Sequence, residues 1–284
     1  MTEVVRTATD LRARVDAWHR RNEKVALVPT MGYLHNAHIA LIEAGRQSCS
    51  KSVVSIFVNP KQFGPDDDFE RYPRDEQNDL SILAAHQVDL AFLPPVGEIY
   101  PSNFSTTIDV PSLTQNLCAI ARPGHYSGVA TVCAKFFNQC LPDVAVFGEK
   151  DYQQLQVIRR MVKDLDIPIE ICGVPTVREA DGLAISSRNV YLNEEGRARA
   201  AQINVILATT AARLTAGHMP PKELAKAHTQ LIEKVGAAPE YIELCNAETL
   251  APVKKLTAPA RLLTAITVNK TRLIDNWPVM PPAI

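Results

Sequence analysis

The 284-residue sequence lacks the features that tie a chain to a metal, a membrane or a nucleic acid. Its six cysteines include no C-x-x-C pair and no histidine partner at zinc spacing, so reduced core cysteines are expected. No apolar run approaches the ~20 residues of a membrane helix, and the first residues lack the apolar centre of a signal peptide. With 30 basic and 31 acidic residues, no charge excess attracts nucleic acid or an anionic membrane. A cytoplasmic protein with neither kind of partner is expected.

Three common motifs are also missing. There is no G-x-x-x-x-G-K-[ST] loop, no G-x-G-x-x-G fingerprint and no H-E-x-x-H pair, so a P-loop NTPase, a conventional dinucleotide enzyme and a zinc protease all lose support. Three consecutive aspartates, Asp66 to Asp68, could suggest a metal site. Acidic runs between Gly and Pro are usually solvated loops, so residues 64–74 are expected to form a loop. If this loop has a function, it is expected to be a mobile segment that covers a binding site. No metal ligands are expected from the protein itself.

The first two-thirds of the chain alternate apolar, β-branched runs with amphipathic stretches. Strands are predicted at Val25–Val28, Ser52–Val58, Val88–Leu93, Val144–Phe147 and Ile169–Val174. Helices are predicted at Ala37–Ser48, Asp75–His86, Val129–Gln139 and Tyr152–Leu165. This alternation predicts parallel strands with crossover helices, hence a Rossmann-like α/β domain over residues 1–176. Ligands of such a sheet bind beyond the carboxyl ends of the strands.

The pattern changes near Val177. Two helices and then three strands are predicted, at Glu194–Ala216, Lys222–Val235, Tyr241–Leu244, Arg261–Val268 and Leu273–Trp277, with Asn269-Lys270 as a turn. Consecutive helices followed by consecutive strands indicate a smaller α+β unit. Residues 177–284 are therefore expected to form a lid domain.

Two histidines three positions apart, His35 and His38, open the first predicted crossover helix. The residues before them are Pro29, Thr30, Met31 and Gly32, which follow the strand. Free backbone N–H groups and the helix dipole favour an anion at such a helix start. Residues at i and i+3 share a helix face, so both imidazoles can reach one phosphoryl group. A pair of surface histidines is the alternative, but strand, turn and helix start together favour a phosphate site.

Two carboxamides, Asn59 and Gln62, follow the next predicted strand. Each offers donors and an acceptor, which suits a small ligand with hydroxyl and carboxylate groups better than a bare phosphate. An ordinary Asn-Pro turn is the alternative, and for this motif alone the favoured one.

A third cluster, Gly148, Lys150, Asp151 and Gln154, lies where a strand hands over to a helix. Glycine allows close approach of a ligand, lysine suits phosphate, and an acid near the helix start can accept from ribose hydroxyls. The alternative, an acid that caps the helix start, explains Asp151. It does not explain why a glycine, a lysine and a glutamine lie at the same end of the helix.

A fourth cluster, Ser186, Ser187 and Arg188, follows the predicted boundary. Two hydroxyls beside a guanidinium can bind several phosphate oxygens. Ser-Ser-Arg is common and weak by itself, but its position makes it a candidate closing jaw. The Arg122–His125 segment is expected to be a turn before a helix, with His125 in a structural role.

Taken together, these segments resemble the pantothenate synthetases (pantoate–β-alanine ligases), a family of the Rossmann-like nucleotidyltransferase superfamily. The similar segments are Pro29–Gly32 with the histidine pair, Ser55–Phe63, Arg71–Arg74, Arg122–His125, Phe147–Gln154 and Gly182–Asn189. They span most of the first 190 residues, whereas the last ninety match mainly in layout. Ala37 stands where the superfamily's H-x-G-H signature has glycine, and its methyl group is expected to tune nucleotide affinity or rate.

The resemblance implies that pantoate attacks ATP to form a pantoyl adenylate and pyrophosphate, and that β-alanine then yields pantothenate and AMP. The implied catalytic residues are His35, His38, Lys150, Ser186, Ser187 and Arg188, all on ATP phosphates. Further implied ATP contacts are Pro29, Thr30, Met31, Gly32, Gly148, Asp151 and Val177, with Gly148 and Asp151 at the ribose. Gln62 and Gln154, assisted by Asn59, are implied to bind pantoate. Mg²⁺ carried by the ATP phosphates and a homodimer are implied as well.

Two other functions stay open at this point. A nucleotidyltransferase of similar fold would keep the nucleotide in its product, and it would explain the histidines but not the two glutamines. A nucleotide-binding module without turnover is the second alternative, and Ala37 is its motivation.

Overall fold

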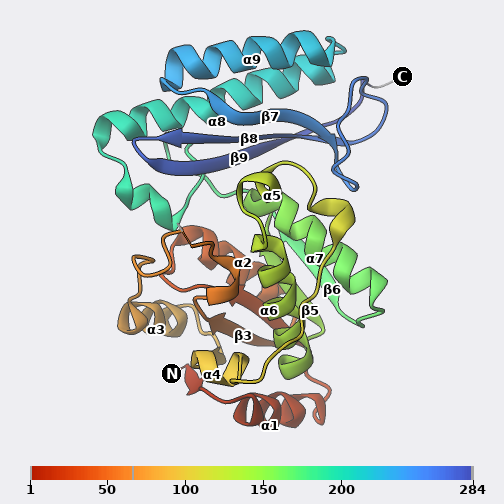
Figure 1. Ribbon diagram of the computed structural model, residues 1–284. Coiled ribbons are helices and arrows are strands. Elements are labelled where there is room, and N and C mark those ends of the chain that lie inside the picture. The colour runs from red at the N-terminus through yellow and green to blue at the C-terminus, as the bar shows by residue number, and fades with distance from the viewer. Residues whose placement is uncertain (1, 66, 283–284) are drawn as a thin grey trace. The chain divides into compact units, whose positions relative to one another are not determined.

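The computed structural model describes residues 2–65 and 67–282, which form two compact units (Figure 1). The first unit consists of the described residues up to Glu149 together with Val157–Pro175. The second consists of Lys150–Gln156 and the described residues from Thr176 onward. The segment Lys150–Gln156, which lies inside the domain predicted over residues 1–176, thus belongs to the second unit by its contacts.

A six-stranded parallel sheet forms the centre of the first unit, in the order β1-β4-β3-β2-β5-β6. Its strands are β1 (Glu3–Val5), β2 (Val25–Thr30), β3 (Lys51–Ile56), β4 (Leu90–Phe92), β5 (Val144–Gly148) and β6 (Glu170–Val174). The predicted α/β class and parallel strands are confirmed. From β2 the chain runs outward through β3 and β4 and then returns to β5 on the other side of β2. The topological switch point therefore lies between β2 and β5, where α/β sheets bind ligands.

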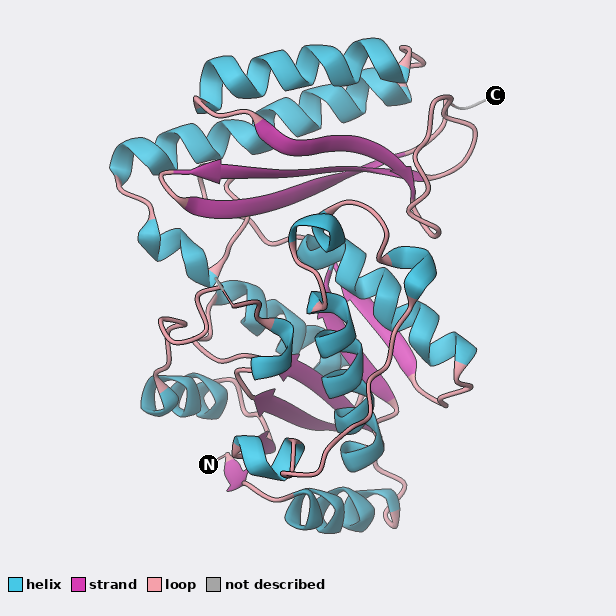
Figure 2. Cartoon of the chain, in the orientation of Figure 1, coloured by secondary structure: helices cyan, strands magenta, loops and turns pink. Residues whose placement is uncertain are grey.

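Helices cover both faces of this sheet (Figure 2). The helices of the first unit are α1 (Ala8–His19), α2 (Asn36–Ser48), α3 (Glu76–Ala85), α4 (Val96–Ile99), α5 (Cys118–Ala121) and α6 (His125–Cys140), and α7 (Tyr152–Asp164) belongs to both units. Short 3-10 turns are η1 (Pro60–Gln62), η2 (Pro111–Leu113) and η3 (Glu149–Asp151). Successive strand residues face opposite sides. Ala91 of β4 joins the cluster that includes Ile42 of α2 and Leu83 of α3, whereas Phe92 meets Phe136 of α6 edge-on.

The sequence analysis missed β1 and α1 and placed the start of α6 too late. A three-residue strand is too short to show alternation, but Leu11, Val15 and Trp18 of α1 are buried at helical spacing, so its signal was present. The prediction that α6 begins at Val129 is wrong, because Gly124 adopts a left-handed conformation (φ 79°) that starts the helix at His125.

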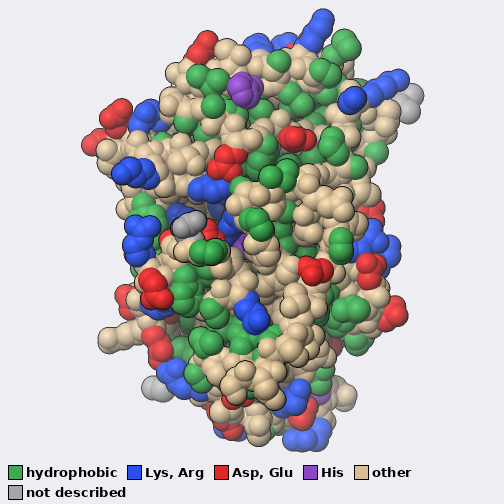
Figure 3. Space-filling model, in the orientation of Figure 1, with side chains coloured by type: hydrophobic (Ala, Val, Ile, Leu, Met, Phe, Trp, Pro, Cys, Tyr) green, Lys and Arg blue, Asp and Glu red, His purple; other side chains and the backbone are tan. Residues whose placement is uncertain are grey.

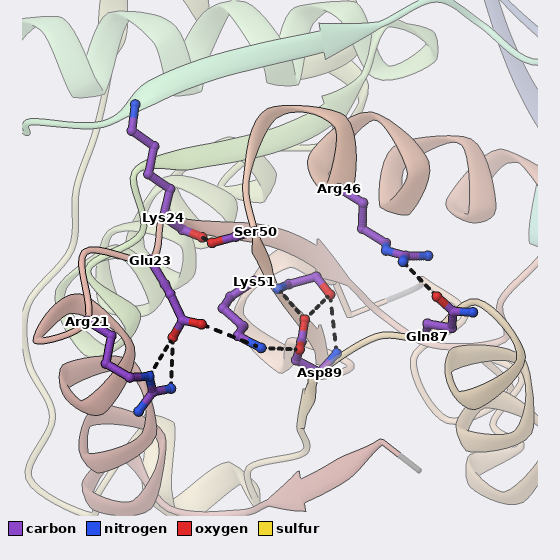
Figure 4. A network of polar contacts seen from close by, with 9 residues as sticks. Arg21, Glu23, Lys24, Arg46, Ser50, Lys51, Gln87 and Asp89 are labelled. Carbon is purple, nitrogen blue, oxygen red and sulfur yellow. Dashed lines mark hydrogen bonds and ion pairs between the residues drawn. The ribbon is translucent and has the colours of Figure 1, made fainter.

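Ion pairs connect the amino ends of β2, β3 and β4 (Figure 4). Asp89, just before β4, accepts from the Lys51 ammonium at 3.0 Å and from the backbone N–H of Ser52 at 2.9 Å. Glu23, just before β2, pairs with Arg21 at 2.8 Å and with Lys51 at 4.0 Å. This network joins the starts of β2, β3 and β4, at the opposite ends of these strands from the loops that carry candidate site residues.

As predicted, the second unit contains two helices followed by three strands, and the structure shows that these strands form an antiparallel sheet. Its elements are η4 (Ser187–Tyr191), α8 (Glu194–Thr215), α9 (Pro220–Val235), β7 (Pro239–Asn246), β8 (Ala260–Val268) and β9 (Thr271–Val279). Strand order is β7-β8-β9, and α8 and α9 lie side by side against the sheet (Figure 1). One apolar cluster joins helix and strand residues such as Leu207, Leu231 and Leu262. Asn269 and Lys270, both at positive φ, form the predicted turn.

Both signs of charge lie on the surface (Figure 3), and the cysteines are free and mostly buried. Basic and acidic side chains are interspersed on the face shown in Figure 3. None of the described helices combines the length and apolar character needed to cross a bilayer. No disulfide joins the described cysteines, and burial raises the pKa of the Cys133 thiol to about 12. That thiol is therefore unreactive near neutral pH.

Candidate functional site

The loop that leaves β2 has a backbone that only glycine fits at one position. Gly32 adopts φ 83°, and a Cβ there would lie 2.9 Å from both Asp79 Oδ2 and Ile56 Cγ2. Thr30 braces the loop, since its hydroxyl donates to the Ser55 carbonyl at 2.7 Å and accepts from the Gly32 N–H at 3.2 Å. The Pro-Thr-Met-Gly segment is therefore a fixed turn at the switch point.

A buried carboxylate holds the same loop from the other side. Asp79 of α3 is 1% exposed and accepts from the backbone N–H groups of Tyr33 at 2.8 Å and Leu34 at 2.7 Å. Burial raises the pKa of this carboxyl, although the two backbone hydrogen bonds act against the rise. The sequence analysis missed Asp79, yet a signal existed: an acid four residues before the core residue Leu83 lies on the buried face of the helix.

Replacing Asp79 with asparagine is expected to destabilise the protein by about 1–3 kcal/mol. An amide oxygen can accept from one of the two backbone N–H groups, but the amide NH₂ then faces the other donor. Urea unfolding measures the change. Asp75→Asn is the matched control, because Asp75 caps α3 through Asn78 N and asparagine caps equally well. Equal midpoints for the two variants would contradict the loop-holding role.

The two histidines lie at the first turn of α2. His35 is the N-cap residue, its backbone N–H donates to His38 Nδ1 at 3.2 Å, and the rings stack with centroids 4.0 Å apart. Because Nδ1 accepts, the neutral His38 ring carries its proton on Nε2. The pair thus combines a helix start at the switch point with an imidazole whose Nε2–H is a donor. The predicted helix start is confirmed within one residue.

Gly148 ends β5, the strand beside β2 across the switch point. A Cβ added there would meet only Leu41 Cδ2 of α2, at the ordinary contact distance of 3.9 Å. The protein's own packing therefore does not demand glycine here. Close approach of a nucleotide, expected from the sequence, remains a prediction that would explain it.

The carboxamides Asn59 and Gln62 lie together beside the β2 loop. Gln62, 8% exposed, donates from Nε2 to Met31 Sδ at 2.9 Å and accepts from Asn59 Nδ2 at 3.1 Å. Asn59, 1% exposed, also donates to the Gly128 carbonyl at 3.1 Å and accepts from Lys61 N and the Tyr100 hydroxyl. Both amide atoms of Asn59 are thus used inside the protein, which makes it a support for Gln62.

Helix α6 packs directly on η1, the turn that carries Gln62. A Cβ at Gly128 would overlap the Lys61 carbonyl and lie 2.7 Å from Gln62 N. His125 Nδ1 lies 2.8 Å from the Gln62 carbonyl oxygen. The sequence analysis did not single out Gly128, because its role depends on a contact between segments more than sixty residues apart.

An ion pair ties the acidic segment 64–74 to Arg122, the C-cap residue of α5. Asp67 pairs with Arg122 at 3.0 Å and accepts from Gly64 N at the same distance. Burial raises the pKa of Asp67, but these two partners outweigh burial and bring it below its usual range. Asp66, part of the suggested aspartate metal site, lies outside the described residues. Within the described residues, no group of three His, Cys, Asp or Glu side chains could hold a metal ion.

In the second unit, the Ser186–Arg188 cluster follows a short hairpin. The backbone N–H of Ile185 donates to the Val177 carbonyl at 3.0 Å, and the backbones of Arg178 and Ala184 form an antiparallel β-bridge. Ser186 caps η4, accepting from Arg188 N at 3.3 Å. The hairpin therefore brings the predicted ATP contact Val177 close to the hydroxyl and guanidinium cluster.

The predicted site residues divide between the two units. The first unit holds Pro29, Thr30, Met31, Gly32, His35, His38, Asn59, Gln62 and Gly148, and the second holds Lys150, Asp151, Gln154, Val177, Ser186, Ser187 and Arg188. Their convergence on one triphosphate remains a prediction.

Comparisons with known proteins agree with one another. The sequence model of the pantoate-beta-alanine ligase family matches residues 3–278. The chain is 49% identical to the pantothenate synthetase of Paramagnetospirillum magneticum over 98% of both chains, and 46% identical to that of Moorella thermoacetica over 96% of this chain and 97% of the relative. The Thermus thermophilus pantothenate synthetase structure aligns with TM-score 0.93 and 44% identity, covering 99% and 100% of the two chains. A Francisella tularensis pantoate-beta-alanine ligase, complexed with beta-gamma ATP and beta-alanine, aligns with TM-score 0.82 and 33% identity over 98% and 97%.

Proposed function

Because the chain belongs to the pantoate-beta-alanine ligase family, its reaction is the ATP-dependent condensation of pantoate with β-alanine, and we propose that a pantoyl adenylate is the intermediate. A free carboxylate reacts poorly with an amine because its leaving group would be oxide. Attack of the carboxylate on the α-phosphorus forms a mixed anhydride and releases pyrophosphate. The β-alanine amine then attacks the acyl carbon, and AMP leaves. The observation that supports this course best is the histidine pair at the helix start beside the switch point.

The protein's part in the first step is to position and stabilise phosphate charge. His35 and His38 hold the departing phosphates, and the Nε2–H that the capping bond leaves on His38 is the donor. Lys150 holds the α-phosphate, and the cluster Ser186, Ser187 and Arg188 holds the β- and γ-oxygens. Mg²⁺ bound through the ATP phosphates would neutralise further charge while keeping waters of its own.

The remaining nucleotide contacts are the turn residues Pro29, Thr30, Met31 and Gly32, together with Val177. Gly148 and Asp151 contact the ribose. Their placement at strand ends and at the hairpin supports this assignment.

Pantoate binds at Gln62 and Gln154, with Asn59 holding the Gln62 amide in place. The 2.9 Å contact between Gln62 and Met31 supports this assignment, because it puts the carboxamide next to the nucleotide turn. A carboxylate and an α-phosphorus must meet there for adenylation to occur.

Replacing Gln62 with alanine is expected to raise the Kd of pantoate about 10- to 100-fold, the value of one or two hydrogen bonds to a charged group. The Kd of ATP should change less than threefold. Titration calorimetry with each ligand measures both values. Gln139→Ala is the matched control, since that α6 glutamine is also 8% exposed. Equal losses for both ligands would mean that Gln62 is structural.

Omission of each substrate in turn tests the reaction course. Pyrophosphate should form with ATP and pantoate alone, and sustained AMP release should need β-alanine too. A nucleotidyltransferase that keeps the nucleotide in its product never releases AMP. ATP binding without pyrophosphate formation would indicate a module without turnover.

The enzyme works in the cytoplasm as a homodimer, an assignment that rests on the resemblance to the family. Sedimentation equilibrium at micromolar concentration measures the association state. A single species with the mass of one chain would refute the dimer.

A further inference from the structure

A buried asparagine connects β9 to the segment that carries Lys150. Asn276 is 2% exposed, its Nδ2 donates to the Lys150 carbonyl at 2.9 Å, and its Oδ1 accepts from Arg261 Nε at 2.5 Å. A guanidinium only donates and a peptide carbonyl only accepts, so the orientation of the amide is fixed. These residues lie within the second unit although 126 positions separate Lys150 from Asn276.

The neighbouring aspartate extends the connection to the hairpin. Asp275, 5% exposed, accepts from Asn276 N at 2.7 Å and from both terminal nitrogens of Arg178 at 2.7 and 3.0 Å. Arg178 also donates to the Gly182 carbonyl at 3.2 Å. The hairpin before the Ser186 cluster is therefore held by the same strand that holds the Lys150 backbone.

Arg261 fixes the other side of the lysine segment. Its guanidinium stacks over the Tyr152 ring at 4.3 Å, and the Tyr152 hydroxyl donates to the Ala247 carbonyl at 2.9 Å. The residues on either side of Asp151 are thus bound to the three-stranded sheet. This explains why Lys150–Gln156 belongs to the second unit.

Stability alone does not account for so polar a set of buried groups. Well-packed apolar residues in place of a buried ion pair are often as stabilising or more so. An apolar side chain at position 276 could not hold a backbone carbonyl, however. A polar side chain at position 276 is therefore needed only if the Lys150 segment has to be held in one position.

We propose that Asp275 and Asn276 are positioning residues, which fix the Lys150 segment relative to the Ser186–Arg188 hairpin so that both can bind one triphosphate. The proposal rests on the phosphate role assigned to Lys150 above. Neither residue needs to touch ATP. Asn276 acts on the lysine backbone, and Asp275 acts on Arg178 at the base of the hairpin.

Asn276→Asp tests the proposal with almost no change in shape. A carboxylate oxygen replaces the donor that faces the Lys150 carbonyl, which breaks that contact while Arg261 keeps an acceptor. A misplacement of about 1 Å can lower a rate about 100-fold. Pyrophosphate formation from ATP and pantoate should therefore fall 10- to 100-fold in kcat, with the pantoate KM changed less than threefold.

A double-mutant cycle with Lys150→Ala separates positioning from general damage. In the Lys150→Ala background, Asn276→Asp should lower the residual rate less than twofold, because the ammonium group that this contact positions is already absent. Thr210→Val, which removes a buried hydroxyl bond within α8 of the same unit, should leave the rate unchanged. Thermal unfolding verifies that each variant is folded. If Asn276→Asp does not fold, Asn276→Ala takes its place in the cycle.

The outcomes distinguish the positioning role of Asn276 from the phosphate role of Lys150, on which it rests. Wild-type kcat in a folded Asn276 variant would overturn the positioning role. So would a double variant whose loss of rate equals the product of the losses of Asn276→Asp and Lys150→Ala. Wild-type kcat in Lys150→Ala itself would instead overturn the phosphate role of the lysine.

Discussion

Replacing His38 with alanine is expected to lower the rate of pyrophosphate release from ATP and pantoate 100- to 1,000-fold, the loss seen when one donor to developing charge is removed. The ring supplies an Nε2–H donor at a helix start beside the switch point, and alanine supplies none. A coupled pyrophosphate assay measures the rate, and circular dichroism verifies the fold. His86→Ala, at the C-cap of α3, is the control and should keep the wild-type rate.

A second substitution separates the capping role of His38 from its chemical role. Glutamine at this third position of a helix can reach back to the N-cap backbone N–H. His38→Gln should therefore recover about 1 kcal/mol of stability relative to His38→Ala without recovering the rate. Unchanged pyrophosphate release in folded His38→Ala would contradict the phosphate assignment.

Replacing Gly128 with alanine is expected to destabilise the protein by about 3 kcal/mol, the upper part of the range for overpacking. The added methyl overlaps backbone atoms of Lys61 and Gln62, which cannot rotate away as a side chain can. The pantoate KM should rise too, because η1 must shift to make room. Urea unfolding and steady-state kinetics measure the two effects.

The matched control for this variant is Gly97→Ala in α4. Nothing lies within 4 Å of a Cβ at Gly97, so alanine there should be neutral or stabilising by up to about 1 kcal/mol. If Gly128→Ala unfolds at the same urea concentration as the wild type, α6 does not pack on η1 as described.

The fold was predictable from the sequence where elements are long and periodic. The apolar runs that form β2, β3 and β5, and the change of pattern near Val177, gave the parallel sheet and the α+β unit. Element β1 was missed because three residues carry no period. The locations of the histidine pair and of the carboxamides were predictable because each follows a strand end within a few residues, whereas their roles stay predictions.

The residues that hold the site in place were not predictable in this way. The helix period indicates that Asp79 is buried but not that it binds the backbone N–H of Leu34, 45 positions away, and Asn276 lies 126 positions from Lys150. Nothing local distinguishes a buried asparagine on a strand from a surface one. Long-range contacts of this kind are set by the topology, which the local pattern of residues does not contain.

The hydrogen bond between the His35 N–H and His38 Nδ1 limits the chemistry open to the pair. One nitrogen of the ring maintains the helix start through its lone pair, so a second proton could be added to this imidazole only by breaking that bond. His38 is therefore suited to donate a hydrogen bond but not to shuttle protons. His38 would then stabilise the departing pyrophosphate as a hydrogen-bond donor, together with the dipoles and cations around it, without acting as its general acid.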